Sequence, residues 1–131
     1  MFTLEFEDTY RILLARFSGI LMPEDISQID QVVTQAIAWG GPLHGMLLDF
    51  SSVQAVGVPQ TFIAVRARLP FISPDCERVF VVPSGELRGL AQRYAALQRA
   101  YGIKAPHVVQ SMSEAYEVLQ LERPDFRPLG A

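Results

Sequence analysis

Few side chains in this sequence could act as a nucleophile with a base beside it. The candidate nucleophiles are Ser51, Ser52, Ser84 and Cys76. Nucleophilic catalysis by Ser or Cys requires a base within hydrogen-bond reach, and histidine is the usual one. His44 and His107 precede or begin strand-like segments, whereas Ser51 and Ser84 follow such segments, so the histidines are expected at the opposite edge of the sheet. The pattern therefore does not favour a catalytic triad.

Metal and cofactor sites are disfavoured for a similar reason. Two separated histidines and one cysteine do not have the spacing of metal ligands. Ser84 and Gly85 begin a strand-to-helix turn, but that turn lacks the lysine of a P-loop and the glycine pattern of a dinucleotide site. We therefore expect no metal, no cofactor and no enzymatic activity.

Asp49 is the acidic residue whose position is most informative. It ends the apolar segment Met46-Leu47-Leu48, which is typical of a buried strand. A carboxylate at such a place must be hydrogen-bonded, and backbone amides of the following loop are its expected donors. The alternative is a small hydrolase or transferase that uses Asp49 with Ser51 or Ser84.

Composition and charge narrow the class of protein. The chain has 131 residues, which is the size of one domain, and its single cysteine excludes an internal disulfide. The net charge of -3 argues against nucleic-acid binding through bulk charge. No apolar run approaches the roughly 20 residues that span a bilayer, and the N-terminus alternates like a strand rather than a signal peptide. A cytoplasmic location is expected.

Basic residues concentrate in one part of the chain. Residues 61–105 carry a net charge of +4, whereas residues 1–60 carry -5. Within the basic segment, Arg66, Arg68 and Arg88 form a candidate basic surface. A solvated helix face is the preferred interpretation of these arginines, and peripheral membrane or lipid binding beside Phe71 and Ile72 is the weaker alternative.

Hydrophobic periodicity and helix signals predict the order of the elements. The apolar residues alternate in the predicted strands, and proline or serine marks each predicted helix start. The expected elements are strands at 2–6 and 10–17 that end at Gly19, a helix from Pro23 to Gly40, a strand at 45–50, a helix from Pro59 to Pro70, a strand at 78–82, a helix from Ser84 to Gly102, a strand at 107–109, and a helix that follows the capping box Ser111 to Glu114.

This order predicts an α/β fold with a mixed, mostly parallel sheet of four to five strands, an N-terminal antiparallel hairpin and about four helices. Residues 1–121 are expected to form a single domain. Residues 122–131 contain two prolines and no hydrophobic period, and they are expected to form a C-terminal tail that Phe126 pins.

Several of these segments resemble the STAS domain family (sulfate transporter and anti-sigma factor antagonist), and more narrowly its stand-alone bacterial SpoIIAA-like members. The resemblance lies in residues 12–21 followed by Pro23-Glu24-Asp25, in Leu47-Leu48-Asp49-Phe50-Ser51, and in Ser111-Met112-Ser113-Glu114-Ala115. It extends to about Leu121. It implies a STAS/SpoIIAA-like fold and a regulatory, protein-binding role.

One departure from the family pattern concerns regulation. In anti-sigma factor antagonists, the Asp that ends the strand is followed about eight residues later by an Asp-Ser-Ser-Gly turn whose serine is phosphorylated. The corresponding stretch here is Gly57-Val58-Pro59-Gln60, which has no hydroxyl group to carry a phosphate. Ser51 and Ser52 lie too early in the loop to match. We therefore expect a binding domain without the phosphoserine switch.

The expected binding site is a rim where the carboxyl ends of the strands meet the following loops. Its occupant would be a protein partner or a small apolar ligand. A homodimer through Trp39, Ile63 or Phe71 is a further possibility. The residues assigned to the rim are Met22, Asp49, Ser51, Ser52, Val58, Pro59, Phe62 and Ile63.

Overall fold

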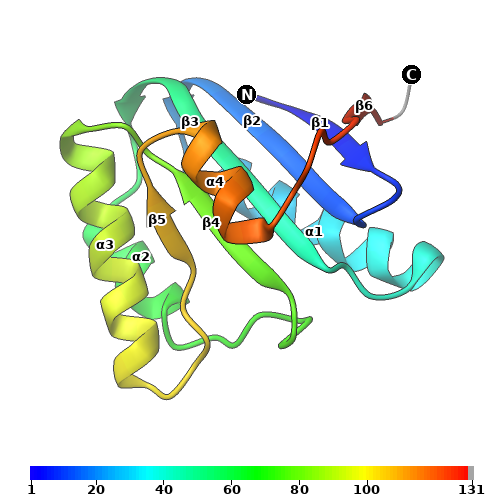
Figure 1. Cartoon of the computed structure of the whole chain (residues 1–131). Helices are drawn as coiled ribbons and strands as arrows, with labels where there is room; N and C mark the ends of the chain where they lie inside the picture. Colours follow the sequence, from blue (N-terminus) through cyan, green and yellow to red (C-terminus); the bar gives the residue numbers. More distant parts are fainter. Residues whose placement is uncertain (130–131) are drawn as a thin grey trace.

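Six strands form one mixed sheet in the computed structural model, which describes residues 1–129 (Figure 1). The strand order across the sheet is β5-β4-β3-β2-β1-β6. The elements in chain order are β1 (Phe2–Glu7), β2 (Ile12–Leu21), α1 (Pro23–Gly40), β3 (Gly45–Val56), α2 (Gln60–Arg66), β4 (Glu77–Val81), α3 (Gly85–Ala100), β5 (His107–Val109), α4 (Met112–Leu119) and β6 (Arg127–Pro128).

The pairing of the strands confirms the predicted fold class. β1 and β2 form the antiparallel hairpin, and β2, β3, β4 and β5 are paired in parallel. The sheet has one strand more than expected, because the two-residue strand β6 pairs antiparallel with β1. A segment so short and so rich in proline carries no periodic signal from which this pairing could be predicted.

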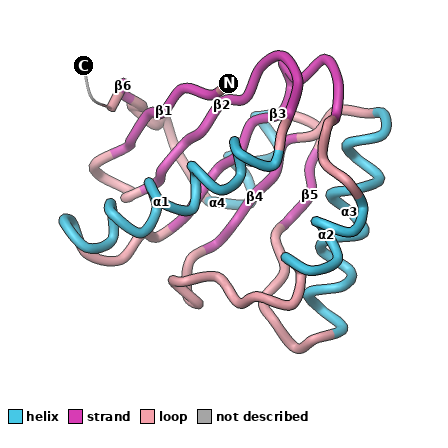
Figure 2. Tube along the Cα trace, turned by 180° about the vertical axis from the view of Figure 1, so that it is seen from behind, coloured by secondary structure: helices cyan, strands magenta, loops and turns pink. Residues whose placement is uncertain are grey.

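Helices cover both faces of the sheet, as Figures 1 and 2 show from opposite sides. On β2, Leu13 and Phe17 point to one face, and Ile12 and Leu14 point to the other. The first face belongs to the core that includes residues of α1 and α3, with α2 packed against it, and the second belongs to a smaller core under α4. This alternation is what a strand buried on both sides requires.

Two strands run further than their sequences predict. β2 does not end at Gly19 but continues to Leu21, because its pairing with β3 resumes after a register shift at Gly19. Gly19 has a φ of +72° at this irregularity. β3 likewise continues past Phe50 to Val56. Its pairing with β4 covers only Gly45 to Asp49, so residues 50–56 have a strand neighbour on the β2 side alone within the described chain.

The predicted helix starts are confirmed for α1 and α4. Pro23 begins α1, and the Asp25 carboxylate accepts a hydrogen bond from the Met22 amide at 2.9 Å. At α4, the Ser111 hydroxyl accepts a bond from the Glu114 amide at 3.2 Å, while the Glu114 carboxylate accepts one from the Gln110 amide at 2.8 Å. Each side chain thus satisfies a backbone donor at its helix start.

The segment after α4 lies along the outer edge of the sheet. The buried Glu7 carboxylate accepts hydrogen bonds from the amides of Thr9 and Asp125, and the Phe126 ring stacks on Tyr116 with centroids 6.3 Å apart. The hydrogen bond from Asp125 lowers the pKa of the Glu7 carboxyl group. The last two residues of the predicted tail, 130 and 131, lie outside the described residues.

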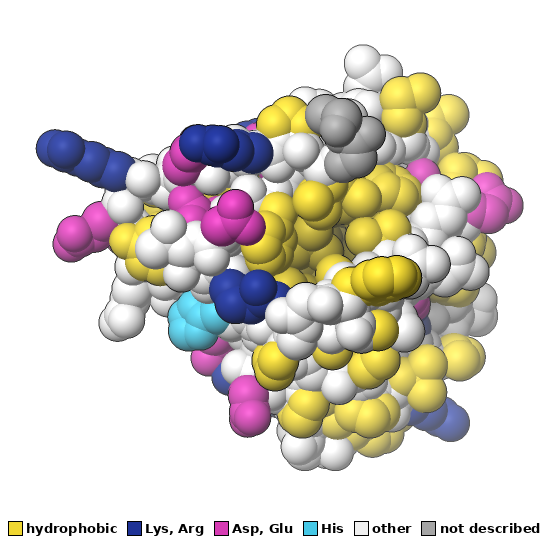
Figure 3. Space-filling model, turned by 90° about the vertical axis from the view of Figure 1, so that its right-hand side faces the viewer, with side chains coloured by type: hydrophobic (Ala, Val, Ile, Leu, Met, Phe, Trp, Pro, Cys, Tyr) yellow, Lys and Arg dark blue, Asp and Glu magenta, His cyan; other side chains and the backbone are white. Residues whose placement is uncertain are grey.

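The face that carries β1, β6 and the end of α1 has a hollow in which hydrophobic side chains gather (Figure 3). On β1, Phe2, Leu4 and Phe6 are only partly buried, and Trp39 near the end of α1 is 90% exposed.

No helix within residues 1–129 is both long enough and apolar enough to cross a membrane.

Candidate functional site

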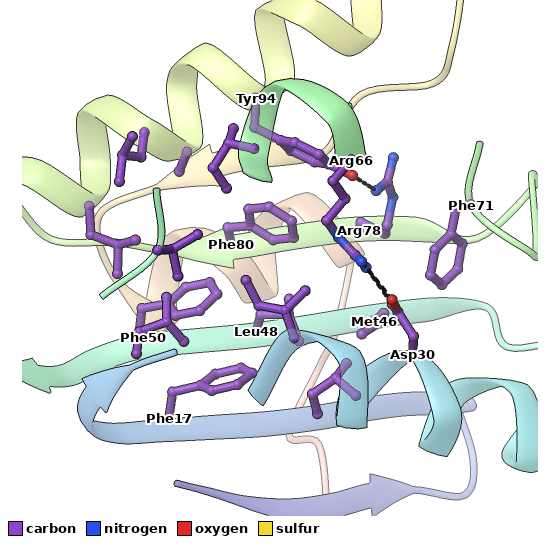
Figure 4. Close-up of a pocket in the computed structure, with 18 residues that line it drawn as sticks. Phe17, Asp30, Met46, Leu48, Phe50, Arg66, Phe71, Arg78, Phe80 and Tyr94 are labelled. Atoms are coloured by element: carbon purple, nitrogen blue, oxygen red, sulfur yellow. Dashed lines mark hydrogen bonds and ion pairs between the residues drawn. The ribbon is translucent and has the colours of Figure 1, made fainter. Parts of the chain in front are cut away.

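An apolar cavity of about 90 Å³ lies between the sheet and the helices α1, α2 and α3 (Figure 4). Aromatic rings from neighbouring strands line its sheet side. Phe17 stacks on Phe50 at 4.8 Å between centroids, Phe50 meets Phe80 edge-on at 5.9 Å, and Phe80 stacks on Tyr94 at 6.1 Å. The strands place the three phenylalanine rings there because their side chains alternate, which brings every second residue to the helix-covered face. The Tyr94 ring comes from α3.

One end of the cavity is polar. The Arg66 guanidinium of α2 forms a two-bond ion pair with the Asp30 carboxylate of α1, one bond of which measures 2.6 Å. The Arg78 guanidinium of β4 donates to the Tyr94 hydroxyl at 3.2 Å and lies 5.1 Å from the centre of the Phe71 ring. Figure 4 shows both contacts at the same end. The two arginines and one aspartate leave a net positive charge there.

A second hollow of about 150 Å³ adjoins this polar end. It shares five residues with the cavity and is otherwise lined by α1 and by the segment that follows α2, including Leu69 and Ile72. The shared residues are Asp30, Arg66, Phe71, Arg78 and Tyr94. The ion pair between Arg66 and Asp30 therefore lines both the apolar cavity and the more polar hollow beside it.

Arg78 is a site residue that sequence reasoning missed. It is buried, and its guanidinium donates 2.6 Å hydrogen bonds to the Gln98 side-chain oxygen and to the Lys104 carbonyl. The only signal in the sequence is alternation, which places Arg78 on the same face of β4 as Phe80. Because arginines are mostly exposed in proteins, a strand residue of this type is ordinarily assigned to the surface.

Asp49 lies on the opposite face of the sheet from the cavity. Its carboxylate accepts a hydrogen bond from the Ser51 amide at 3.0 Å, which confirms a backbone donor just after Asp49, although Ser51 belongs to β3 and not to a loop. Its second oxygen accepts from Arg16 at 3.0 Å, and Arg16 in turn bonds Glu5 at 2.8 Å. Both carboxylate oxygens are thus occupied by structural partners, an arrangement that does not support the hydrolase alternative.

The structure places the residues assigned to the rim in different environments. Val58 and Ile63 line the cavity, and Phe62 packs against the core around it. Ser51 and Ser52 are exposed on β3, and Pro59 is exposed at the start of α2. The last rim residue, Met22, is 39% exposed between β2 and α1.

The arginines of the candidate basic surface have partners within the chain. Arg66 pairs with Asp30, and Arg88 donates to the Val82 carbonyl at 2.8 Å. Arg68 lies 6.0 Å from the centre of the Tyr101 ring.

His107 begins β5, and Cys76 is buried just before β4. At the start of β4, Glu77 lies 2.6 Å from the Lys104 amine and 3.1 Å from His107. Those two contacts lower the pKa of the Glu77 carboxyl group, the lysine more than the histidine. Burial raises the pKa of the Cys76 thiol to about 11. No cluster of three metal-ligating side chains occurs within residues 1–129.

The arrangement of elements is similar to that of two solved structures. One is the anti-sigma factor antagonist SpoIIAA in its unphosphorylated form, with 18% identity, a TM-score of 0.61, and coverage of 92% of this chain and 98% of that one. The other is an anti-sigma factor antagonist from Mycobacterium paratuberculosis, with 13% identity, a TM-score of 0.55, and coverage of 92% and 94%. The SpoIIAA-like fold is therefore confirmed. No protein-family model and no curated protein matches the sequence.

Proposed function

We propose that this chain is a cytoplasmic, non-enzymatic regulatory domain that binds a protein partner through the exposed apolar side chains next to α2. The observation that carries the proposal is the exposure of Ile20 and Met22, which are 57% and 39% exposed at the end of β2. Large apolar side chains that remain in contact with water beside one another mark binding surfaces.

The position of these side chains supports a docking role. β2 and β3 extend past the end of β4 as a two-stranded projection, and Ile20 lies on it. Gly57 ends the projection and donates a backbone hydrogen bond to the Leu21 carbonyl at 2.7 Å, which fixes the turn into α2. On α2 itself, Val65 is 65% exposed. A partner could therefore contact the projection and the helix together.

The comparison with solved structures and the chemistry of the site support a regulatory rather than an enzymatic role. Both similar proteins are anti-sigma factor antagonists, and proteins of that kind act on another protein. The two carboxylate oxygens of Asp49 accept hydrogen bonds from Arg16 and from the Ser51 amide. At the start of α2, Val58 and Pro59 have no hydroxyl group, so partner binding would be controlled without a phosphoserine at that turn.

Site-specific photo-crosslinking tests the proposal. A photoreactive side chain at position 20 is compared in cells with the same side chain at position 117, which is exposed on α4 across the sheet. We expect one protein to be captured from position 20 and not from position 117. The variant Ile20→Asp should then weaken binding of the purified partner at least about tenfold, because it places a charge in an apolar contact.

Two results would count against a protein partner at this surface. One is identical capture from positions 20 and 117, which would indicate nonspecific contact. The other is capture of a second copy of this chain alone, which would favour the homodimer instead.

A further inference from the structure

We propose that the cavity between the sheet and α2 binds a small amphipathic carboxylate, with its apolar body inside and its carboxylate on Arg78. This ligand site is separate from the protein-binding surface proposed above, because Ile20 and Met22 do not line the cavity. The proposal rests on the apolar interior, on the charge at its polar end, and on a barrier that side-chain motion can open.

The interior is suited to an apolar body. Apart from Asp30, Arg66, Arg78 and the Tyr94 hydroxyl, the cavity is lined by aliphatic and aromatic side chains. Its volume of about 90 Å³ is smaller than that of an apolar protein cavity of about 150 Å³ that binds benzene. The apolar part of this space offers water no hydrogen-bonding partners and is suited to a short hydrocarbon group.

The polar end is suited to an anion because the charge of Arg78 is not neutralised. Within residues 1–129 no carboxylate lies within ion-pair distance of its guanidinium, although the residue is only 7% exposed. A guanidinium has five N–H donors. Three hydrogen bonds, to Tyr94, Gln98 and Lys104, leave two of those donors for a ligand. Buried charges are normally paired, so an unpaired one beside an apolar cavity indicates an anionic ligand.

Arg66 differs from Arg78 because a carboxylate neutralises its charge. Arg66 faces the same end of the cavity, but Asp30 holds both of its terminal nitrogens. One uncompensated positive charge therefore remains, which matches a singly charged carboxylate. The donors that remain are on Nε and Nη1 of Arg78, so a carboxylate would accept separate charge-assisted hydrogen bonds from them.

The ion pair between Arg66 and Asp30 lines one end of the cavity and also lines the hollow of about 150 Å³ beside it. The two side chains are 26% and 44% exposed, so their pairing is partly solvated. Rotation of the Arg66 side chain would join the two spaces without any change in the sheet.

Binding of n-hexanoate to the unmodified protein is the primary test. It is compared with 1-hexanol, which has the same chain but no charge, and with hexylammonium, which has the opposite charge. We expect hexanoate to bind at least about tenfold more tightly than hexanol, because of the charge-assisted bonds to Arg78. Amide chemical shift changes should concentrate on residues around Arg78, Tyr94 and Phe71. Equal binding of hexanoate and hexanol, or no saturable shifts at these residues, would overturn the proposal.

Matched variants separate the roles of charge and space. Arg78→Gln should remove the preference for hexanoate over hexanol, whereas Arg88→Gln, at an arginine that does not line the cavity, should retain it. Ala91→Leu should fill part of the cavity and weaken both probes, whereas Ala96→Leu changes an exposed position of the same helix and should not. If Arg78→Gln does not fold, the comparison of the three probes on the unmodified protein decides.

The variant Ile20→Asp separates this proposal from the proposed function. It should bind hexanoate as the unmodified protein does, even where its protein partner is lost. Loss of hexanoate binding in Ile20→Asp would contradict the proposal that the ligand site and the protein-binding surface are independent.

Discussion

The guanidinium of Arg78 and the side-chain amide of Gln98 form a 2.6 Å hydrogen bond between β4 and α3. The fully buried Gln98 also donates its amide nitrogen to the Leu69 carbonyl at 3.0 Å. One glutamine thus joins the charged end of the cavity to the segment that follows α2. We expect these bonds to help hold α2 over the cavity.

Gln98→Leu should lower the free energy of unfolding by about 1–3 kcal/mol, because it leaves buried donors and acceptors without partners. It should also loosen the segment after α2, seen as faster amide hydrogen exchange in residues 60–72. Urea denaturation measures the first effect. Gln92→Leu, at an exposed position of the same helix, is the control and should leave both quantities nearly unchanged.

Asp49→Asn should lower the free energy of unfolding by about 1–3 kcal/mol, since it removes the charge that Arg16 and the Ser51 amide share. The exposed pair of Asp125 and Arg127 offers a matched control. Asp125→Asn should cost less than about 0.5 kcal/mol, because exposed ion pairs contribute little. Full stability of Asp49→Asn in urea would show that the carboxylate is not a structural anchor.

Asp49 and Arg78 differ in how far their roles can be predicted from the sequence. Asp49 was predicted as a hydrogen-bonded anchor because a carboxylate after a buried strand must be satisfied locally. Arg78 was not predicted, because its partners Gln98 and Lys104 lie 20 and 26 residues away and only the packing of α3 brings them close. Local chemistry was therefore predictable, and chemistry assembled from distant elements was not.

The ends of helices and strands are likewise predictable where local residues set them and not where distant elements do. Pro23 and the pair Ser111 and Glu114 act on their own helices, so the starts of α1 and α4 were predicted correctly. Gly19 was interpreted as the end of a strand, but pairing with β3 keeps it within β2 as an irregularity. A glycine with positive φ is compatible with both a turn and a bulge, and only the neighbouring strand decides.

Gly45→Ala should destabilise the protein by about 1–3 kcal/mol through overpacking. A Cβ atom at this position would lie 2.7 Å from Ile12 Cδ1, 3.0 Å from Leu119 Cδ2 and 3.3 Å from the Glu77 carbonyl oxygen. Gly89→Ala is the opposite case, because nothing lies within 4 Å of its Cβ on the exposed side of α3. It should stabilise the helix by about 0.5–1 kcal/mol. Similar changes in the thermal midpoint for both variants would contradict this packing.

The attachment of residues 122–129 should depend on pH through Glu7. Hydrogen bonds from the Asp125 amide, and from those of Thr9 and Tyr10, hold the native pKa of Glu7 below its ordinary value of 4.5. A lowered pKa means that the attachment is fully present above pH 4.5 and is lost as the pH falls through the native pKa. Amide exchange at Asp125 and Leu129, corrected for its intrinsic pH dependence, should therefore accelerate in acid.

Glu7→Gln should produce the same acceleration at neutral pH and should abolish its dependence on pH. Glu122→Gln, which is exposed in the same segment, is the control. An unchanged exchange rate at Asp125 in Glu7→Gln would show that other contacts hold the segment in place.

The incomplete pairing of β3 has a consequence for how the protein behaves at high concentration. Beyond Asp49, one side of the strand lacks a neighbour within the described chain, so its main-chain groups could extend the sheet of a second molecule. Ser51, Ser52 and Gln54 are three of the seven residues in this stretch. Their polarity, together with the register shifts in the pairing with β2, makes a flat intermolecular ladder unfavourable. Replacing Ser51, Ser52 and Gln54 with valine or isoleucine should therefore favour fibrous assembly and lower the solubility of the protein.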